Sequence, residues 1–160
     1  FNDKAPNHVK SFVDLAASGF YDGTLFHRVI PGFVVQAGDP LTKDPARSAL
    51  WGTGGATDPK GNPIELKPEF NDVTHRRGIV SMARGPKPDS ASSQFFIVLK
   101  DSPFLDHEYT VFGEVVKGMD AIDKLVTDSN PDTSDQRTGG KPRSYQKIVK
   151  IDLVDEMPAP

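Results

Sequence analysis

One short stretch of the sequence, Phe26–Asp39, combines residues that could bind and polarise a substrate. Arg28, Phe33 and Gln36 occur close together in it, and we expect their side chains on one face of the fold. A guanidinium is planar, permanently charged and rich in N–H donors. Beside an apolar floor, it could donate hydrogen bonds to a group that the floor holds. Arg28 is therefore the candidate catalytic donor.

Further blocks downstream add a second glutamine, Gln94, and more aromatic surface. These blocks are Gly78–Ala83, Ser93–Ile97 and Phe104–Gly113. Together and in this order, the blocks closely resemble the cyclophilin family of peptidyl-prolyl cis-trans isomerases. The resemblance runs from about Asp3 to Val154, and Phe104 and Tyr109 are similar to the residues of some bacterial members.

The resemblance implies an enzyme that accelerates rotation about X-Pro peptide bonds and so assists protein folding. This rotation is slow because the C–N bond has partial double-bond character, with a barrier of about 18–20 kcal/mol. In the twisted bond the prolyl nitrogen becomes pyramidal and can accept a hydrogen bond, so a donor and an apolar cradle both help. Shortening a step of about 100 s to about 1 ms requires roughly 7 kcal/mol. One charged hydrogen bond contributes only about 1.5–3 kcal/mol, so pocket shape must supply the rest.

The resemblance also assigns the site residues. Arg28 and Gln36 are the predicted catalytic residues, with Gln36 positioning the arginine and the substrate carbonyl. The predicted substrate-binding residues form the proline-ring pocket or line the extended peptide: Phe33, Val34, Ala83, Arg84, Gln94, Phe96, Phe104, Leu105 and Tyr109. No cofactor or metal is implied. The expected partners are proline-containing peptides and unfolded proteins, and we expect a monomer.

Three positions depart from the best-known family pattern. Val34 stands where methionine is common, Phe104 where tryptophan often occurs, and Tyr109 where histidine often occurs. Phe104 still offers an aromatic wall but lacks an indole N–H, which weakens the expectation of cyclosporin binding. Tyr109 argues against a mechanism based on histidine at that position.

Other interpretations of these residues are available. Taken alone, Arg28 is more typical of a structural ion pair, and the aromatic residues are more typical of a barrel core. The main functional alternative is a non-catalytic module that binds proline-containing segments. Retention of Arg28 and Gln36 beside the aromatic floor favours catalysis, because recognition alone does not require the arginine.

Several other motifs are incomplete. The Gly52–Gly55 run lacks the Gly-Lys-Ser/Thr of a phosphate loop and is predicted to be a flexible loop edging the substrate groove. Acidic residues from Asp128 onward resemble a calcium loop, but Thr133 and Gly139 replace its glycine and closing glutamate. Ser81 has neither a nucleophile elbow nor a plausible base, which argues against a hydrolase. The four histidines show no metal-ligand spacing.

Composition argues against several kinds of site and several classes of protein. The chain of 160 residues has no cysteine, so disulfides and thiolate sites are excluded. Its net charge of −3 and scattered basic residues argue against nucleic-acid binding. No apolar run approaches the roughly 20 residues that span a bilayer, so no membrane association is expected. We expect a cytoplasmic protein, with a periplasmic or secreted location if a signal peptide has been removed.

Periodicity predicts two helices and six strands. Pro6–Ser18 is amphipathic, and Met119–Val126 has apolar residues on one face. The predicted strands are rich in β-branched and aromatic residues: Leu25–Ile30, Phe33–Ala37, Ile79–Ala83, Phe95–Leu99, Thr110–Val115 and Ile148–Val154. In the last of these, Val149, Ile151 and Leu153 are expected to share a buried face.

These elements predict a mainly β fold, an antiparallel barrel capped by two α-helices, which is also the fold that the resemblance implies. Long turn-rich connections, Pro40–Pro68 and Asp128–Ser144, join the elements. We expect one domain over residues 1–155 and a flexible tail over residues 156–160. Because cyclophilins begin with one or two strands ahead of the segment that starts here at Phe1, we expect an N-terminally truncated domain with an open barrel.

Overall fold

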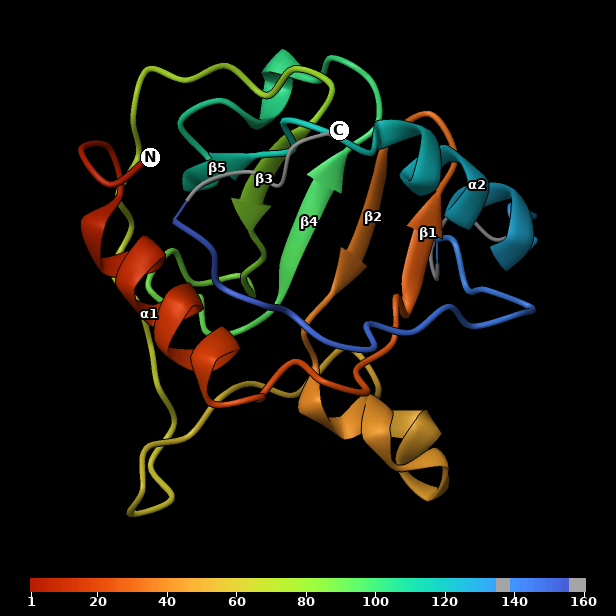
Figure 1. Ribbon diagram of the computed structural model, residues 1–160, viewed down its shortest axis with the longest axis horizontal. Helices are drawn as coiled ribbons and strands as arrows, with labels where there is room; N and C mark the ends of the chain where they lie inside the picture. The colour runs from red at the N-terminus through yellow and green to blue at the C-terminus, as the bar shows by residue number, and fades with distance from the viewer. Residues whose placement is uncertain (135–138, 156–160) are drawn as a thin grey trace.

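The computed structural model describes residues 1–134 and 139–155, so the predicted tail lies outside the described residues. It contains two α-helices, α1 (Pro6–Ala17) and α2 (Met119–Ser129). Its five strands are β1 (Arg28–Ile30), β2 (Val34–Ala37), β3 (Ile79–Met82), β4 (Phe95–Val98) and β5 (Val111–Glu114). All neighbouring strands are antiparallel, in the order β1-β2-β4-β3-β5 (Figure 1). Within the described residues the sheet does not close, which agrees with the expected open, mainly β architecture.

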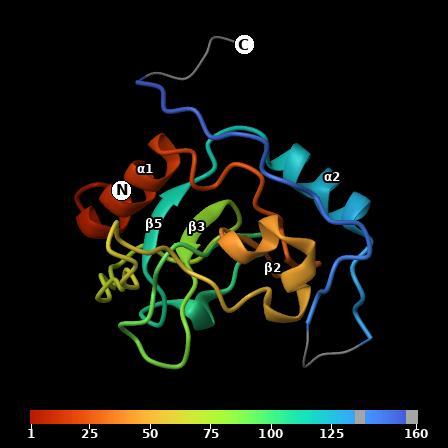
Figure 2. The same ribbon diagram turned by 90° about the horizontal axis from the view of Figure 1, so that it is seen from below.

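The two faces of the sheet bury different clusters, because side chains alternate along each strand. One face carries Val29, Val35 and Phe95, and it packs against apolar residues of α1 and α2. In Figure 2 both helices lie on the same side of the sheet. The opposite face carries Val34 and Phe96 in a second, smaller cluster. The helices thus leave that second face available for a site.

Helix α1 forms as predicted. Pro6 occupies its first turn, where the missing N–H costs nothing, and Gly19 beyond its end adopts φ of 72°. The ring of Phe12 lies 5.1–5.4 Å from the rings of Tyr21, Phe95 and Phe112. This aromatic cluster fixes the helix against the sheet.

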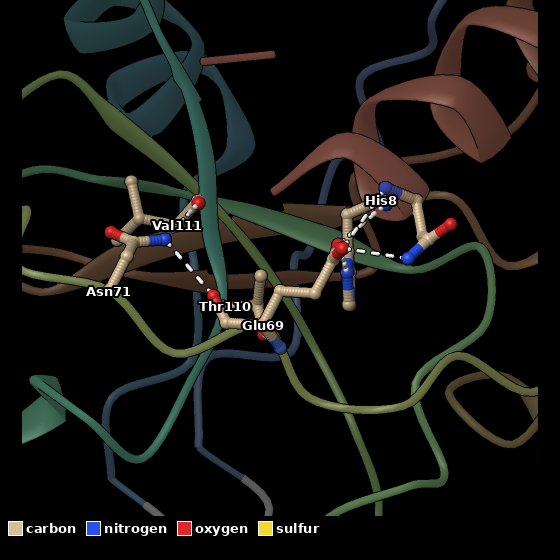
Figure 3. Close-up of polar contacts among 6 residues, drawn as sticks. His8, Glu69, Asn71, Thr110 and Val111 are labelled. Carbon is tan, nitrogen blue, oxygen red and sulfur yellow. Dashed lines mark hydrogen bonds and ion pairs between the residues drawn. The ribbon is translucent and has the colours of Figure 1, made fainter. Parts of the chain in front are cut away.

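The N-terminus of α1 is capped from a distant loop. Ala5 at the N-cap has no side chain that could accept a hydrogen bond. Instead, the Glu69 carboxylate accepts from the backbone N–H groups of Asn7 (3.1 Å) and His8 (2.9 Å), and His8 Nδ1 lies 2.6 Å from it (Figure 3). The Glu69 N–H donates to Thr110 Oγ1 at 3.0 Å, immediately before β5. Glu69 therefore ties the helix to the sheet.

Glu69→Gln should lower the free energy of unfolding by about 1–2 kcal/mol, because a charged acceptor at a helix N-terminus is lost. Partial burial raises the pKa of the Glu69 carboxyl, but hydrogen bonds from the side chain and amide of His8 and from the amide of Asn7 outweigh it. The net pKa lies below the ordinary 4.5. The stabilisation of the folded state by the ionised Glu69 carboxylate is therefore complete above pH 4.5. It is lost as the pH falls through the lowered pKa of Glu69.

Denaturant titrations at pH 7 and at acidic pH would measure this effect, with exposed Glu65→Gln as the matched control. The difference between wild type and Glu69→Gln should shrink toward acidic pH. A difference that stays constant with pH would contradict the charged-cap explanation.

The prediction of a strand at Ile148–Val154 is wrong. Backbone hydrogen bonds join Gly23 N–H to Ile148 O (2.7 Å), Ile148 N–H to Thr24 O (2.9 Å) and Phe26 N–H to Gln146 O (2.9 Å), but among the described residues this pairing does not extend beyond Ile148 into the predicted strand. Val149 is 78% exposed and Leu153 is 51% exposed, so they share no buried face. Apolar alternation specifies which side chains could share a face, but a strand also requires a partner along its length.

The limits of the other elements differ less from those predicted. Helix α2 runs three residues beyond the predicted Val126, to Ser129. The predicted connection Pro40–Pro68 contains two 3₁₀ helices, Pro40–Lys43 and Pro45–Leu50, whose N-termini are capped by the Asp39 and Asp44 side chains. Among residues 1–134 and 139–155, no helix has the length and apolar character needed to cross a membrane.

Candidate active site

The register of the sheet places the candidate catalytic residues in one row. Arg28 on β1 pairs with Gln36 on β2, Gln36 pairs with Phe96 on β4, and Phe96 pairs with Ser81 on β3. Directly paired residues project to the same face of a sheet. The row therefore carries a cation, an amide and an aromatic ring side by side on the face opposite the helices.

A groove of about 490 Å³ lies over this row. Its apolar part is lined by Phe33, Val34, Phe96, Leu105 and Tyr109. Phe96 is 5% exposed, and the ring of Tyr109 meets it edge-on at 5.5 Å. Leu105 comes from the short 3₁₀ helix that precedes Tyr109. Arg28 and Gln36 border this apolar part.

A chain of amides orients Arg28. One guanidinium N–H donates to Gln36 Oε1 at 3.3 Å, and Gln36 Nε2 donates to Gln94 Oε1 at 2.9 Å. Gln94 Nε2 then donates to the carbonyls of Gly52 (3.0 Å) and Gly54 (2.8 Å). A guanidinium only donates and a carbonyl only accepts, so both ends fix the direction in which the two glutamine amides point. We call this series the amide relay.

Gly52 lines the groove, so the Gly52–Gly55 run borders it as predicted, but buried Asp39 holds the run, which was expected to be flexible. The Asp39 carboxylate accepts from Gly52 N–H at 2.5 Å and from Gly54 N–H at 3.2 Å. A Cβ on Gly54 would lie 2.1 Å from Asp39 Oδ1, so the approach requires glycine there. The amides that could have faced a phosphate are thus occupied by a carboxylate of the protein.

Burial shapes the charges in the groove. It lowers the pKa of Arg28, an effect that the nearby Tyr109 opposes, but a guanidinium remains charged in proteins. Burial also lowers the pKa of His27, which lines the groove and whose Nδ1 has no hydrogen-bond partner among the described residues. Of these two neighbouring residues, Arg28 is therefore the charged donor.

The structure brings a base to Ser81, which the sequence analysis did not foresee. His75 Nε2 lies 2.9 Å from Ser81 Oγ, and His75 Nδ1 lies 2.8 Å from the Asp106 carboxylate. Ser81 and His75 are almost fully buried, and neither lines the groove. The imidazole lies nearly parallel to the Phe96 ring, with centroids 6.1 Å apart. This arrangement supports the floor of the groove and has no access for a substrate to hydrolyse.

Two predicted substrate-binding residues lie at the periphery of the main groove. Gln94 belongs to the amide relay and lines a smaller adjoining pocket. Phe104 is 70% exposed and lines neither pocket, but its ring stacks on Phe33 with centroids 5.6 Å apart. The structure brings together the other nine predicted residues around the groove: Arg28, Phe33, Val34, Gln36, Ala83, Arg84, Phe96, Leu105 and Tyr109.

Comparison with known proteins identifies the family. Residues 1–152 match the sequence model of the family described as "Cyclophilin type peptidyl-prolyl cis-trans isomerase/CLD". The chain belongs to the cyclophilin family. A probable peptidyl-prolyl cis-trans isomerase of Brucella abortus (strain 2308) is 42% identical over 154 residues, which cover 94% of this cyclophilin and 73% of the relative. Peptidyl-prolyl cis-trans isomerase A of Dickeya dadantii is 47% identical over 129 residues, 78% of this chain and 62% of that protein.

The fold of this cyclophilin is also similar to solved structures. A cyclophilin-type peptidyl-prolyl cis-trans isomerase of Cryptosporidium parvum, crystallised in the presence of the dipeptide Ala-Pro, superimposes with a TM-score of 0.79 and 33% identity. The match covers 98% of this chain and 90% of the other. The structural and sequence comparisons therefore agree on the family.

Besides His27, the groove of this cyclophilin includes four residues that the sequence analysis did not identify as site residues: Ser48, Trp51, Lys141 and Tyr145. All four come from long connections, where no periodicity predicts which side chains meet. A lone tryptophan in a loop was the one available signal, since Trp51 is the single tryptophan of the chain.

Proposed function

We propose that this cyclophilin catalyses the cis–trans isomerisation of X-Pro bonds in peptides and unfolded proteins, at the groove over β1, β2 and β4. The observation that carries the proposal is the amide relay, which holds the Arg28 guanidinium beside an apolar pocket. A pocket alone would suffice for binding, but the oriented donor suits the nitrogen that loses resonance as the bond twists.

The roles of the other residues follow from their places in the groove. We propose that Phe33, Phe96 and Leu105 hold the prolyl ring, with Val34 and Tyr109 completing the pocket. Phe104 supports this pocket through its stacking on Phe33.

The polar side of the groove would receive the peptide backbone. Gln36 is proposed to position both Arg28 and the substrate carbonyl, while the backbone at Ala83 and Arg84 borders the extended peptide. The Ala-Pro dipeptide named for the Cryptosporidium parvum structure supports a ligand of this class.

An exchange measurement tests the proposed function. The protein at micromolar concentration should accelerate cis–trans exchange in an Ala-Pro peptide, from tens of seconds to a rate visible by NMR exchange spectroscopy. A non-catalytic proline-binding module would instead shift the peptide resonances without raising the exchange rate. Saturable binding with an unchanged exchange rate would therefore reject catalysis and favour the binding module.

A further inference from the structure

We propose that this groove prefers proline-containing peptides that carry a carboxylate beside the prolyl bond, and that Lys141 is the residue that selects it. The inference deepens the proposed function, because it concerns ligands of the same groove. Lys141 would act on specificity, whereas Arg28 would act on the rotating bond.

The charge of the groove wall motivates this proposal. Three cationic residues line the groove, Arg28, Arg84 and Lys141, and among the described residues no Asp or Glu lines it. The chain as a whole carries a net charge of −3, so the groove differs in sign from the rest of the protein. Such a local field attracts ligand groups of opposite charge.

The three cations are not equally available. Arg84 donates to the Glu108 carbonyl at 2.8 and 3.0 Å, lies 3.6 Å from the Glu108 carboxylate, and covers the Tyr109 ring at 4.9 Å. Arg28 makes no ion pair among the described residues, but the proposed function assigns it to the rotating bond, where the amide relay holds it beside the apolar pocket. Lys141 is exposed and forms no ion pair with any residue in the described part of the chain. Lys141 is thus the cation best placed to meet a ligand carboxylate.

A close backbone contact fixes where Lys141 lies. Val29 N–H donates to the Gly140 carbonyl at 2.8 Å, so the chain before Lys141 runs against β1. Gly140 has φ of 84°, and a Cβ there would lie 2.3 Å from Val29 O, so only glycine fits. This contact anchors Lys141 next to the strand that carries Arg28.

Two aromatic rings complete this end of the groove. The Trp51 indole N–H donates to the Leu41 carbonyl at 2.9 Å, which fixes the ring, and Tyr145 meets Trp51 edge-on at 5.1 Å. Both rings line the groove together with Lys141. In a peptide whose proline is bound in the apolar pocket, the residue next to the proline would therefore meet aromatic walls and one cation. These surroundings suit a side chain with an apolar stem and a carboxylate.

The carboxylate could come from an Asp or Glu side chain or from a peptide C-terminus. Blocked peptides with Glu one or two positions before or after proline, each matched with a Gln peptide, test the side chain. Peptides ending one or two residues after proline, free or amidated, test the terminus. Dissociation constants would come from NMR titration, with Trp51 fluorescence as a second readout, because Trp51 is the only tryptophan.

We expect at least one acidic peptide to bind about two- to five-fold more tightly than its neutral partner, the range of a solvent-exposed ion pair. Lys141→Gln should abolish this preference, and added salt should weaken it in the wild type. Lys147→Gln removes the same charge from the same segment but outside the groove, so it should retain the preference.

Equal affinities for acidic and neutral peptides, or a preference that survives Lys141→Gln, would overturn the inference. Binding is measured here independently of turnover. A protein that accelerates exchange without any carboxylate preference would refute the role of Lys141 alone, whereas a preference without exchange would refute the proposed catalysis alone.

Discussion

Replacing Arg28 with alanine is expected to lower kcat/KM for an X-Pro peptide by about 10²-fold while leaving the fold intact. The side chain donates to Gln36 but makes no ion pair within the described residues, so its removal disturbs few native contacts. The loss corresponds to about 2.7 kcal/mol, which lies within the roughly 1.5–3 kcal/mol of one charged hydrogen bond. NMR exchange spectroscopy or a protease-coupled assay would measure it.

Two variants accompany this measurement. Arg28→Lys keeps the charge but loses the planar fork, so it should recover only part of the activity. Arg76→Ala removes a surface arginine paired with Glu114 and should leave turnover unchanged. Near wild-type activity in Arg28→Ala, with the same denaturant midpoint, would show that Arg28 is not the donor.

Phe96→Ala is expected to affect both stability and substrate binding. Phe96 is 5% exposed and forms the floor between His75 and Tyr109. Deleting a buried phenylalanine ring costs about 3–5 kcal/mol, a large share of the roughly 5–15 kcal/mol of a typical domain. KM should rise strongly, because the prolyl ring loses its floor. Chemical denaturation and peptide kinetics below the unfolding temperature would measure the two effects.

Phe96→Leu separates the two contributions. Leucine restores most of the buried apolar volume, so the stability loss should fall to about 1.5 kcal/mol or less. The flat aromatic surface is still missing, so KM should remain above that of the wild type. If Phe96→Leu bound peptides as well as the wild type, the role of Phe96 would be reduced to filling volume.

Much of the fold and the centre of the site could be predicted from sequence. The sequence analysis expected the side chains of Arg28 and Gln36 on one face of the fold, and the register, which pairs the two residues across β1 and β2, agrees. Helix α1 was also predicted almost to the residue, because a proline, an apolar stripe and a glycine mark its limits. Local sequence patterns were sufficient to predict these features, because they depend on residues that are close together in the chain.

The remaining features depend on contacts between distant segments. The prediction of a strand at Ile148–Val154 failed because apolar alternation does not show whether another segment pairs with the run. The contact of His75 with Ser81 depends on how a loop folds back onto β3. Trp51 and Lys141 both line the groove because contacts of Asp39 and Gly140 hold two long connections in place, and neither contact leaves a periodic signal.

The amide relay orients Arg28 without a carboxylate partner among the described residues. Most buried arginines are held by a carboxylate, which fixes the side chain but also neutralises it. In this protein the groups that orient Arg28 are uncharged amides, so no ion pair among the described residues offsets its positive potential at the bond on which we propose that it acts. This arrangement fixes the direction of the guanidinium and leaves its positive charge uncompensated, so that it can interact with a ligand.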